Sequence, residues 1–395
     1  MATKPTIALI PSGYGTNKVY SVLPSDGSGD FTFGRTGTAT RINKDKLIES
    51  VGSNIPRIDY TDSGCPSLLL EPQRTNFVTY SEDFSNTAWN TGATRSVNFV
   101  PTSTIDPNGK TNAYRVTSTA SNNQVAIIPI IISGQIYTNS IYVRRVYGSG
   151  NVILRNVNNQ ENHFQVSVND GWKRIETTAT ALTQFGRLYV NLYTVGDIIE
   201  IWGGQVELGS FGTSIIPTTG TSVTRIAETA TGSGNADTFN DSEGVLMVET
   251  SALISGGSTR VISLSSGSQS VNNIYFNFNP NGTLSCQVLT SGGNNNLSTS
   301  SINQENNNKI LVKYKANDFA LWVNGFEADI DTSLSSTPIG LDRLNFDFGS
   351  GSFDFYGKTK QLQYYNTALT DLELETLTSF TSFNAMALAL NYTIY

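Results

Sequence analysis

Charged side chains, histidine and cysteine are all scarce in this chain of 395 residues. Charged residues make up 14 % of it, against about 25 % in ordinary soluble proteins. The one histidine, His163, excludes metal sites built from several histidines, and any serine or cysteine triad would have to use it. The chain also lacks a Gly-x-Ser-x-Gly nucleophile elbow. We therefore predict a protein without enzymatic activity and assign no catalytic residue.

The two cysteines, Cys65 and Cys286, are too far apart in sequence to indicate a disulfide framework or a zinc site. Cys286 lies in an alternating run between Leu284 and Val288. That position predicts a small buried apolar side chain rather than a reactive thiol.

Positive charge and long apolar runs are also missing. The net charge is −7, and phosphate recognition needs a basic surface, so nucleic acid is not an expected partner. The longest apolar run, residues 125–132, is interrupted by Pro129 and is shorter than the ~20 residues of a membrane helix. Residues 6–10 are too short for a signal-peptide core, so we expect no membrane insertion and no secretory export.

Asn, Ser, Thr and Gly take the place of the missing charges, and they suit short strands joined by many turns. A chain of this length predicts about two to four domains. Residues 1–76 are turn-rich and poor in apolar residues, so we expect an attachment segment that leans on the next domain or on neighbouring copies. Residues 77–225 contain several short strands at regular spacing, which indicate an antiparallel sandwich.

Residues 226–240 lack an apolar pattern and are predicted to be a linker. Residues 241–395 form a second β block, in which Asn324-Gly325 between alternating runs predicts a hairpin. Thr370 with Glu373 makes a capping box, so one short helix should run from Asp371 to about Ser379. The apolar tail, residues 386–395, would add a strand or contact another subunit.

Residues 201–225 contain the pattern Gln205-x-Glu207-x-Gly209, then Phe211, residues 215–218 (Ile-Ile-Pro-Thr) and Thr224-Arg225. This pattern resembles the closing segment of carbohydrate-binding-type jelly-roll modules, which are common in phage tail-fibre and virion surface proteins. Residues 56–60, 65–76, 81–84 and Trp89 look like the lead-in and opening of such a module. The resemblance spans roughly residues 30–230. Within it, Glu207 is expected to hold a loop through hydrogen bonds.

Residues 322–325 (Trp-Val-Asn-Gly), then Gly357, residues 362–366 and residues 368–373, resemble the last third of laminin-G and concanavalin A-like lectin domains. The fold class predicted is therefore all-β. It comprises two antiparallel β-sandwich domains, one jelly-roll and one lectin-like, with a turn-rich N-terminal segment and one short C-terminal helix.

Sugar binding uses aromatic faces, which cover the apolar side of a pyranose, together with planar polar groups that reach its hydroxyls. Tyr189, Asn191 and Tyr193 share one face of a predicted strand whose opposite face is apolar. The alternative for this face is that it packs against a neighbouring domain or subunit. The alternative for His163 is a surface or strand-edge position without a binding role. The predicted glycan-binding set is Tyr142, Tyr147, Arg155, His163, Tyr189, Asn191 and Tyr193.

No cofactor is predicted. Lectin-like sandwiches often hold one Ca²⁺ through loop carboxylates, and Asp83, Asp106, Asp197 and Asp342 are in loop-like contexts without a diagnostic spacing. The carboxylates nearest in form to a glycosidase pair are Glu327, Asp329 and Asp331, which follow the hairpin and should face solvent.

Together these features predict a phage virion structural protein, a fibre or surface decoration made in the host cytoplasm and released by lysis. Its expected partners are other virion proteins, further copies of the chain in a homotrimer, and host surface polysaccharide. A secreted bacterial adhesin and a glycan depolymerase are the alternatives. The sequence does not distinguish head from tail.

Overall fold

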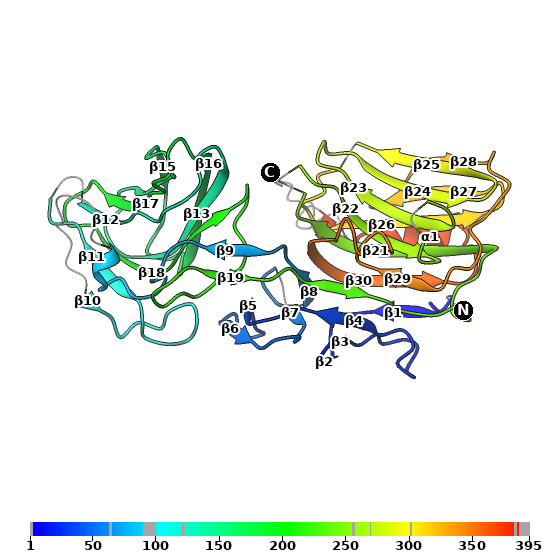
Figure 1. Cartoon of the computed structure of the whole chain (residues 1–395), viewed down its shortest axis with the longest axis horizontal. Coiled ribbons are helices and arrows are strands. Elements are labelled where there is room, and N and C mark those ends of the chain that lie inside the picture. The colour runs from blue at the N-terminus through cyan, green and yellow to red at the C-terminus, as the bar shows by residue number, and fades with distance from the viewer. Residues whose placement is uncertain are drawn as a thin grey trace. The chain divides into compact units, whose positions relative to one another are not determined.

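The computed structural model describes residues 3–62, 65–89, 100–120, 123–254, 257–268, 270–300, 302–382 and 385–386. The chain forms two compact units. Unit 1 consists of Met1–Thr36, Val51–Pro72 and Ala227–Tyr395, and unit 2 of Gly37–Ser50 and Gln73–Ile226. Each unit is a sandwich of antiparallel sheets (Figure 1), so the predicted all-β fold class is confirmed.

Unit 1 pairs an eight-stranded sheet, in the order β28-β27-β26-β21-β30-β8-β7 with β1 on β30, with a five-stranded sheet, β25-β24-β23-β22-β29. The larger sheet contains β1 (Ile7–Leu9), β7 (Arg57–Asp59), β8 (Ser67–Leu70), β21 (Glu243–Ala252), β26 (Asn308–Lys315), β27 (Phe319–Val323), β28 (Phe326–Asp331) and β30 (Gly357–Tyr365). The smaller contains β22 (Arg260–Ser265), β23 (Asn273–Phe278), β24 (Leu284–Thr290), β25 (Gly293–Thr299) and β29 (Arg343–Asn345). A further sheet contains β2 (Tyr14–Gly15), β3 (Lys18–Val19), β4 (Phe31–Gly34) and β20 (Thr229–Thr231).

The main core of unit 1 lies between its two larger sheets. Leu246 of β21 and Phe276 of β23 belong to this core, and Cys286 is fully buried in it. Burial raises the pKa of the Cys286 thiol, which agrees with the predicted role of a small apolar side chain. On the other face of β21, Met247 packs with Leu374 of the helix α1 (Asp371–Thr378).

Two local predictions in unit 1 are confirmed. Asn324 and Gly325 form the turn between β27 and β28 with φ angles of 53° and 89°, a left-handed conformation that these two residues tolerate. Helix α1 starts after Thr370, whose backbone N–H donates to the Glu373 carboxylate at 3.0 Å. In the part of the chain that the structure describes, no helix has the length and apolar character needed to cross a membrane.

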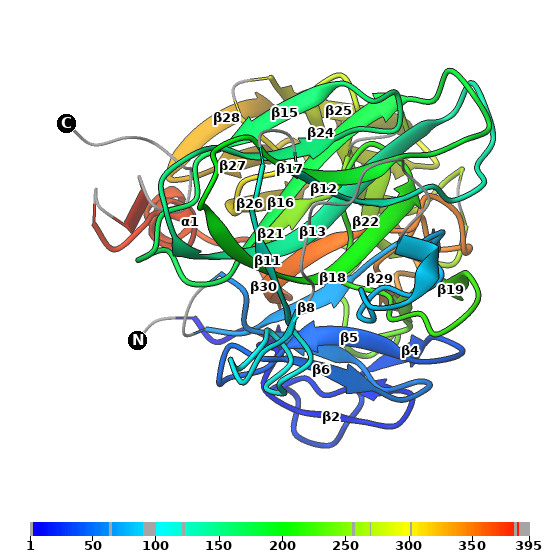
Figure 2. The ribbon, with the colours of Figure 1, turned by 90° about the vertical axis from the view of Figure 1, so that its left-hand side faces the viewer.

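Unit 2 pairs a seven-stranded sheet, β10-β11-β18-β13-β16 with β9 and β19, with a four-stranded sheet, β12-β17-β14-β15. Strands β16, β13 and β18 run side by side in both views (Figures 1 and 2). The seven-stranded sheet contains β9 (Arg74–Asn76), β10 (Val100–Pro101), β11 (Tyr114–Thr117), β13 (Ile136–Tyr147), β16 (Lys173–Thr180), β18 (Ile198–Leu208) and β19 (Val223–Arg225). The other elements are β12 (Asn123–Ile127), β14 (Val152–Arg155), β15 (Glu161–Phe164), β17 (Leu188–Leu192), the pair β5 (Ala39–Ile42) and β6 (Ile48–Val51), and the 3₁₀ turn η1 (Thr87–Trp89).

The motif that closes unit 2 acts as a loop anchor. Glu207 is fully buried, and its carboxylate accepts hydrogen bonds from the Thr213 backbone N–H at 2.7 Å and the Thr213 hydroxyl at 2.6 Å. The side-chain oxygen of Gln205 accepts from the Ile216 backbone N–H at 2.8 Å. The expected role of Glu207 in holding a loop is therefore confirmed.

The first 76 residues, predicted to be an attachment segment that leans on the next domain or on neighbouring copies, are divided between the two units. Strands β1 and β8 pair with β30, and Leu9 and Leu68 are fully buried in the core of unit 1. Residues 37–50 and strand β9 belong to unit 2. These short strands need few apolar residues because each is completed by an existing sheet.

Residues 226–240, predicted to be a linker, also differ from expectation. They include β20, which pairs with β4, and Ala230 and Glu228 are fully buried. The segment looks featureless in sequence because its partners, β4 and residues 344–346, are distant in the chain, and a local apolar pattern does not reveal such pairings. The apolar tail is predicted to add a strand or contact another subunit, but its residues 387–395 lie outside the described residues.

Candidate functional site

Five of the seven predicted glycan-binding residues meet on the outer face of the four-stranded sheet of unit 2. Leu188, Val190 and Leu192 of β17 enter the core, so the residues between them face outward. This confirms the predicted two-faced character of the strand. In the register between β17 and β14, Tyr189 lies opposite Arg155.

On the neighbouring strands, further residues lie opposite those of β17 and β14 and continue the outer face across the sheet. In β15, Glu161 lies opposite Arg155 and His163 lies opposite Ile153. Ile153 in turn lies opposite Asn191, and Asn191 lies opposite Gln124 of β12. Directly opposed residues project to the same side of a sheet, so the outer face presents a mixed polar and aromatic surface.

Arg155 is the centre of a hydrogen-bonded group on this face. Its Nη2 lies 2.7 Å from Glu161 Oε1 and donates to the Tyr193 hydroxyl at 3.0 Å. Its Nε donates to Asn191 Oδ1 at 3.2 Å, and its Nη1 donates to Asn159 Oδ1 at 3.1 Å. With Gln124 and His163 described below, these residues form the Arg155 cluster: Gln124, Arg155, Asn159, Glu161, His163, Asn191 and Tyr193.

The carboxylate of Glu161 joins Arg155 to two further side chains. The Tyr193 hydroxyl donates a hydrogen bond to Glu161 Oε1, and His163 Nε2 lies 3.5 Å from Glu161 Oε2. Burial, followed by the hydrogen bond to Glu161, raises the pKa of Tyr193. Tyr193 therefore stays a neutral hydrogen-bonding group, and Glu161 accepts hydrogen bonds from both Arg155 and Tyr193.

The side chains of Tyr193 and Arg155 meet over the outer face of the sheet and cover the pair Asn191 and Ile153. Tyr193 follows β17 at one end, Arg155 is at the opposite end of β14, and Asn191 and Ile153 lie between them. Asn191 is therefore 0 % exposed and Ile153 1 % exposed, although both face outward. The prediction that Asn191 offers a surface group is wrong, because its side chain accepts from Arg155 and donates to Gln124 at 3.5 Å.

Three side chains of the predicted set remain open to a ligand on this face. Tyr193 is 38 % exposed, and the side chain of His163 is 48 % exposed. Tyr189 is half-buried beside Arg155. Two tyrosine rings thus lie next to polar groups whose positions are fixed by hydrogen bonds.

The other two predicted residues are on the seven-stranded sheet. The ring of Tyr142 packs against Trp202 with 5.5 Å between centroids, in a cluster that includes Ile48 and Ile215. Tyr147 is 66 % exposed but ends β13, where it pairs with Ile198. Tyr142 was misassigned because residues 37–50 cover its face of the sheet, and this covering segment cannot be read from alternation within β13.

Three members of the Arg155 cluster were not predicted from the sequence: Gln124, Asn159 and Glu161. Glu161 could have been found, because it lies two residues before His163 and alternation places both on the same face of one strand. Gln124 and Asn159 carried no signal, since the first depends on which strand neighbours β17 and the second belongs to a turn.

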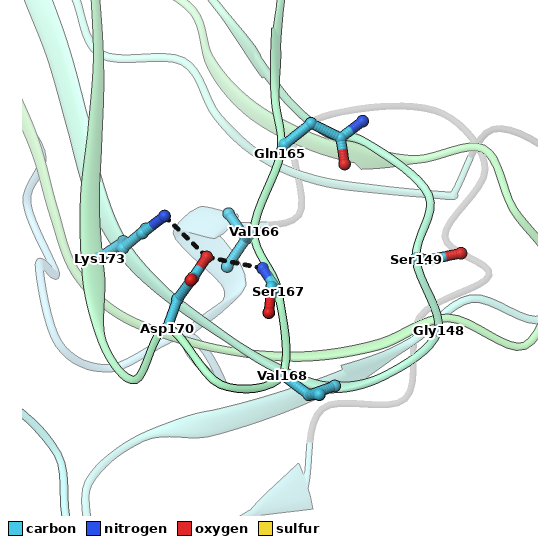
Figure 3. Close-up of a pocket in the computed structure, with 8 residues that line it drawn as sticks. All are labelled: Gly148, Ser149, Gln165, Val166, Ser167, Val168, Asp170 and Lys173. Carbon is cyan, nitrogen blue, oxygen red and sulfur yellow. Dashed lines mark hydrogen bonds and ion pairs between the residues drawn. The ribbon is translucent and has the colours of Figure 1, made fainter. Parts of the chain in front are cut away.

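Unit 2 also has an open pocket of about 390 Å³ between residues 148–149 and residues 165–173 (Figure 3). Figure 3 shows the Asp170 carboxylate between the Lys173 amino group, at 2.7 Å, and the Ser167 backbone nitrogen, at 2.8 Å. The hydrogen bond to Lys173 lowers the pKa of Asp170. The lining residues are Gly148, Ser149, Gln165, Val166, Ser167, Val168, Asp170 and Lys173. With no aromatic ring among them, this pocket cannot stack a sugar, and the Arg155 cluster is the better candidate.

The four aspartates considered for Ca²⁺ each hold a different partner. Asp83 accepts from the Ser85 backbone, and Asp106 from three backbone N–H groups of residues 108–112. Asp197 pairs with Arg145 at 2.7 Å, and Asp342 pairs with the adjacent Arg343 at 2.6 Å. Among the described residues, no group of three His, Cys, Asp or Glu side chains is arranged to hold a metal ion.

The carboxylates compared with a glycosidase pair lie on the edge strand β28. Glu327 is exposed, Asp329 accepts from the Ser298 backbone N–H at 2.9 Å, and Asp331 accepts from the Ser333 backbone N–H at 2.6 Å. The hydrogen bonds from Ser333 lower the pKa of Asp331. A general acid needs a raised pKa, so Asp331 does not suit that role.

No protein-family model matches the chain, and no curated protein matches it. Several solved structures are similar in part. The CBM40 module of the Ruminococcus gnavus IT-sialidase, bound to α2,3-sialyllactose, has a TM-score of 0.33 at 16 % identity, covering 38 % of this chain and 94 % of the module. The NanB sialidase of Streptococcus pneumoniae has 0.32 at 17 % identity, covering 38 % and 29 %. The SAP-like pentraxin of Limulus polyphemus has 0.30 at 12 % identity, covering 36 % and 71 %. Likeness at this level gives no indication of the function of this chain.

Proposed function

We propose that unit 2 is a non-enzymatic glycan-binding module and that the outer face of its four-stranded sheet is the binding surface. The observation that carries the proposal is the position of Tyr189 and Tyr193 beside the fixed polar groups of the Arg155 cluster. The rings supply apolar contact for a pyranose. Glu161 and His163 are within reach of its hydroxyls.

The binding surface is the face of a sheet rather than a deep cleft, which limits the area that one sugar can bury. Single-site affinity is therefore expected near millimolar, about −4 kcal/mol. Many copies held together could raise the avidity by ~10²–10⁴ where their spacing allows simultaneous contact. Binding should accordingly be measured on a multivalent display.

Tyr189→Ala combined with Tyr193→Ala should reduce binding of bead-displayed protein to its glycan by about tenfold or more, since both stacking faces are lost. The matched control is Tyr147→Ala, which removes a 66 % exposed tyrosine from the other sheet and should leave binding unchanged. A glycan array followed by titration on the strongest glycan provides the measurement. Normal binding by a folded double variant would show that this face is a packing surface.

We further propose that the protein is a virion structural protein of a phage, a fibre or surface decoration that assembles as a homotrimer with other virion proteins. The support is the resemblance of residues 201–225 to virion modules and the low charged fraction of 14 %. Closed cyclic symmetry is the common arrangement of identical chains. On this proposal the glycan is a host surface polysaccharide that the particle meets during adsorption.

Antibody labelling in electron microscopy should decorate purified particles of the source phage at a fixed position on the head or tail. Label confined to bacterial cells would instead favour a secreted adhesin. Release of reducing sugar from host polysaccharide by the purified protein would favour a depolymerase. Either result would overturn the virion structural assignment.

A further inference from the structure

The charges of the Arg155 cluster bear on the class of glycan it can accept. Arg155 contributes one positive charge and Glu161 one negative charge, and their nearest atoms are 2.7 Å apart. We propose that the Arg155 cluster selects neutral sugars, an inference that rests on the proposed glycan-binding function. Glu161 excludes acidic sugars by occupying the guanidinium that would otherwise bind their carboxylates.

Most N–H donors of Arg155 are already used within the protein. A guanidinium has five N–H donors, and four hydrogen bonds leave it toward Asn159, Glu161, Asn191 and Tyr193. Its side chain is 15 % exposed. Recognition of a carboxylate by arginine typically uses two parallel N–H groups. That fork is already directed at neighbours within the protein.

The negative charge of Glu161 also opposes an acidic ligand. The Glu161 side chain is 29 % exposed, so an incoming carboxylate would meet its negative charge before it reached Arg155. Like charges at hydrogen-bond range repel and both require solvation, which disfavours an acidic ligand in this position. A neutral sugar meets no such penalty, and its hydroxyls can donate to the exposed carboxylate.

Two other basic side chains, His163 and Arg187, belong to or adjoin the strands of this sheet. His163 Nε2 is 3.5 Å from Glu161 Oε2, where it can donate to the carboxylate without displacing Arg155. Arg187 directly precedes β17 and is half-buried. It is the second arginine next to this strand and therefore supplies a control for acidic binding that does not involve Arg155.

The test is an array of oligosaccharide pairs that differ only in one carboxylate, such as glucose against glucuronic acid and lactose against sialyllactose, probed with bead-displayed full chain. The wild type should bind neutral members at least about tenfold more tightly than their acidic partners. Glu161→Gln removes the negative charge and leaves only a neutral carbonyl acceptor, which holds the Arg155 guanidinium less strongly than the carboxylate and can be displaced by the carboxylate of a sugar. This variant should reduce that ratio by about tenfold or more and bind acidic members in a salt-sensitive manner.

Two further variants locate the effect. Adding Arg155→Gln to Glu161→Gln should abolish the gained acidic binding, whereas adding Arg187→Gln should leave it intact. Unchanged near-ultraviolet circular dichroism of Glu161→Gln shows that its fold is retained, and Glu161→Asp, which keeps the charge, should retain the neutral preference. If the wild type prefers acidic sugars through Tyr189 and Tyr193, this inference falls while the proposed function stands. If no glycan binds, both fall.

Discussion

Glu228→Ala is expected to destabilise unit 1 by about 3–5 kcal/mol, because it leaves two buried arginines without their shared carboxylate. Glu228 Oε1 lies 2.7 Å from Arg35 Nη1 and 2.8 Å from Arg57 Nε. The side chains of all three residues are 0 % exposed. Arg57 also pairs with Glu71 at 2.7 Å, so four charged groups are held together inside the unit.

Burial and the neighbouring carboxylates act in opposite directions on the pKa values of the two arginines. Burial lowers the pKa of Arg35, against the attraction of Glu228. For Arg57 burial also opposes the charged form, but the carboxylates of Glu228 and Glu71 outweigh it and raise the pKa. Both arginines therefore depend on Glu228 for their charge to be tolerated in the interior. Alanine removes that compensation and leaves their donors partly unmatched.

Urea unfolding followed by labelling of the Cys286 thiol measures the effect, since Cys286 is buried in unit 1 and reacts only when the unit opens. Cys65 is exposed and provides an internal standard for labelling. The matched control is Asp62→Ala, which removes a surface partner of Lys358 at 3.0 Å and should cost at most about 1 kcal/mol. If Glu228→Ala costs no more than this control, the buried network does not stabilise unit 1.

The features that could be predicted from the sequence are those specified by neighbouring residues. Alternation in residues 188–193 correctly separated a buried face from an outer one. The Asn324-Gly325 turn and the start of α1 followed from residues within a few positions. In each case the pattern is enforced by backbone geometry or by one local hydrogen bond, so no knowledge of the remaining chain was required.

What could not be predicted depends on partners that are distant in sequence. The pairing of β4 with β20 joins segments that are far apart in the sequence. The burial of Arg35 and Arg57 runs against the usual exposure of charged residues, and their contacts with the distant Glu228 help to make it favourable. The Arg155 cluster shows the same division. The residues that β17 contributes to its outer face were predictable from alternation. The contact with Gln124 was not, because it depends on β12 being the strand that pairs with β17.

Glu207→Ala should destabilise unit 2 by about 3 kcal/mol, because a fully buried acceptor with several partners is lost. Besides Thr213, the carboxylate accepts from Gln205 Nε2 at 2.8 Å, and Arg74 and Arg174 each lie 3.9 Å from it. The variant would leave both arginines less compensated and release the loop that contains Thr213.

Three of the four tryptophans, Trp89, Trp172 and Trp202, lie in unit 2, so intrinsic fluorescence during urea unfolding reports the change. Trp202 packs in a cluster with Ile215 of the same loop and should become more exposed even before the main transition. Glu207→Gln keeps one acceptor oxygen for Thr213 and should recover about half of the lost stability. An unfolding midpoint equal to that of the wild type in Glu207→Ala would mean that the packing of Ile215 and Trp202, rather than the carboxylate, holds this loop.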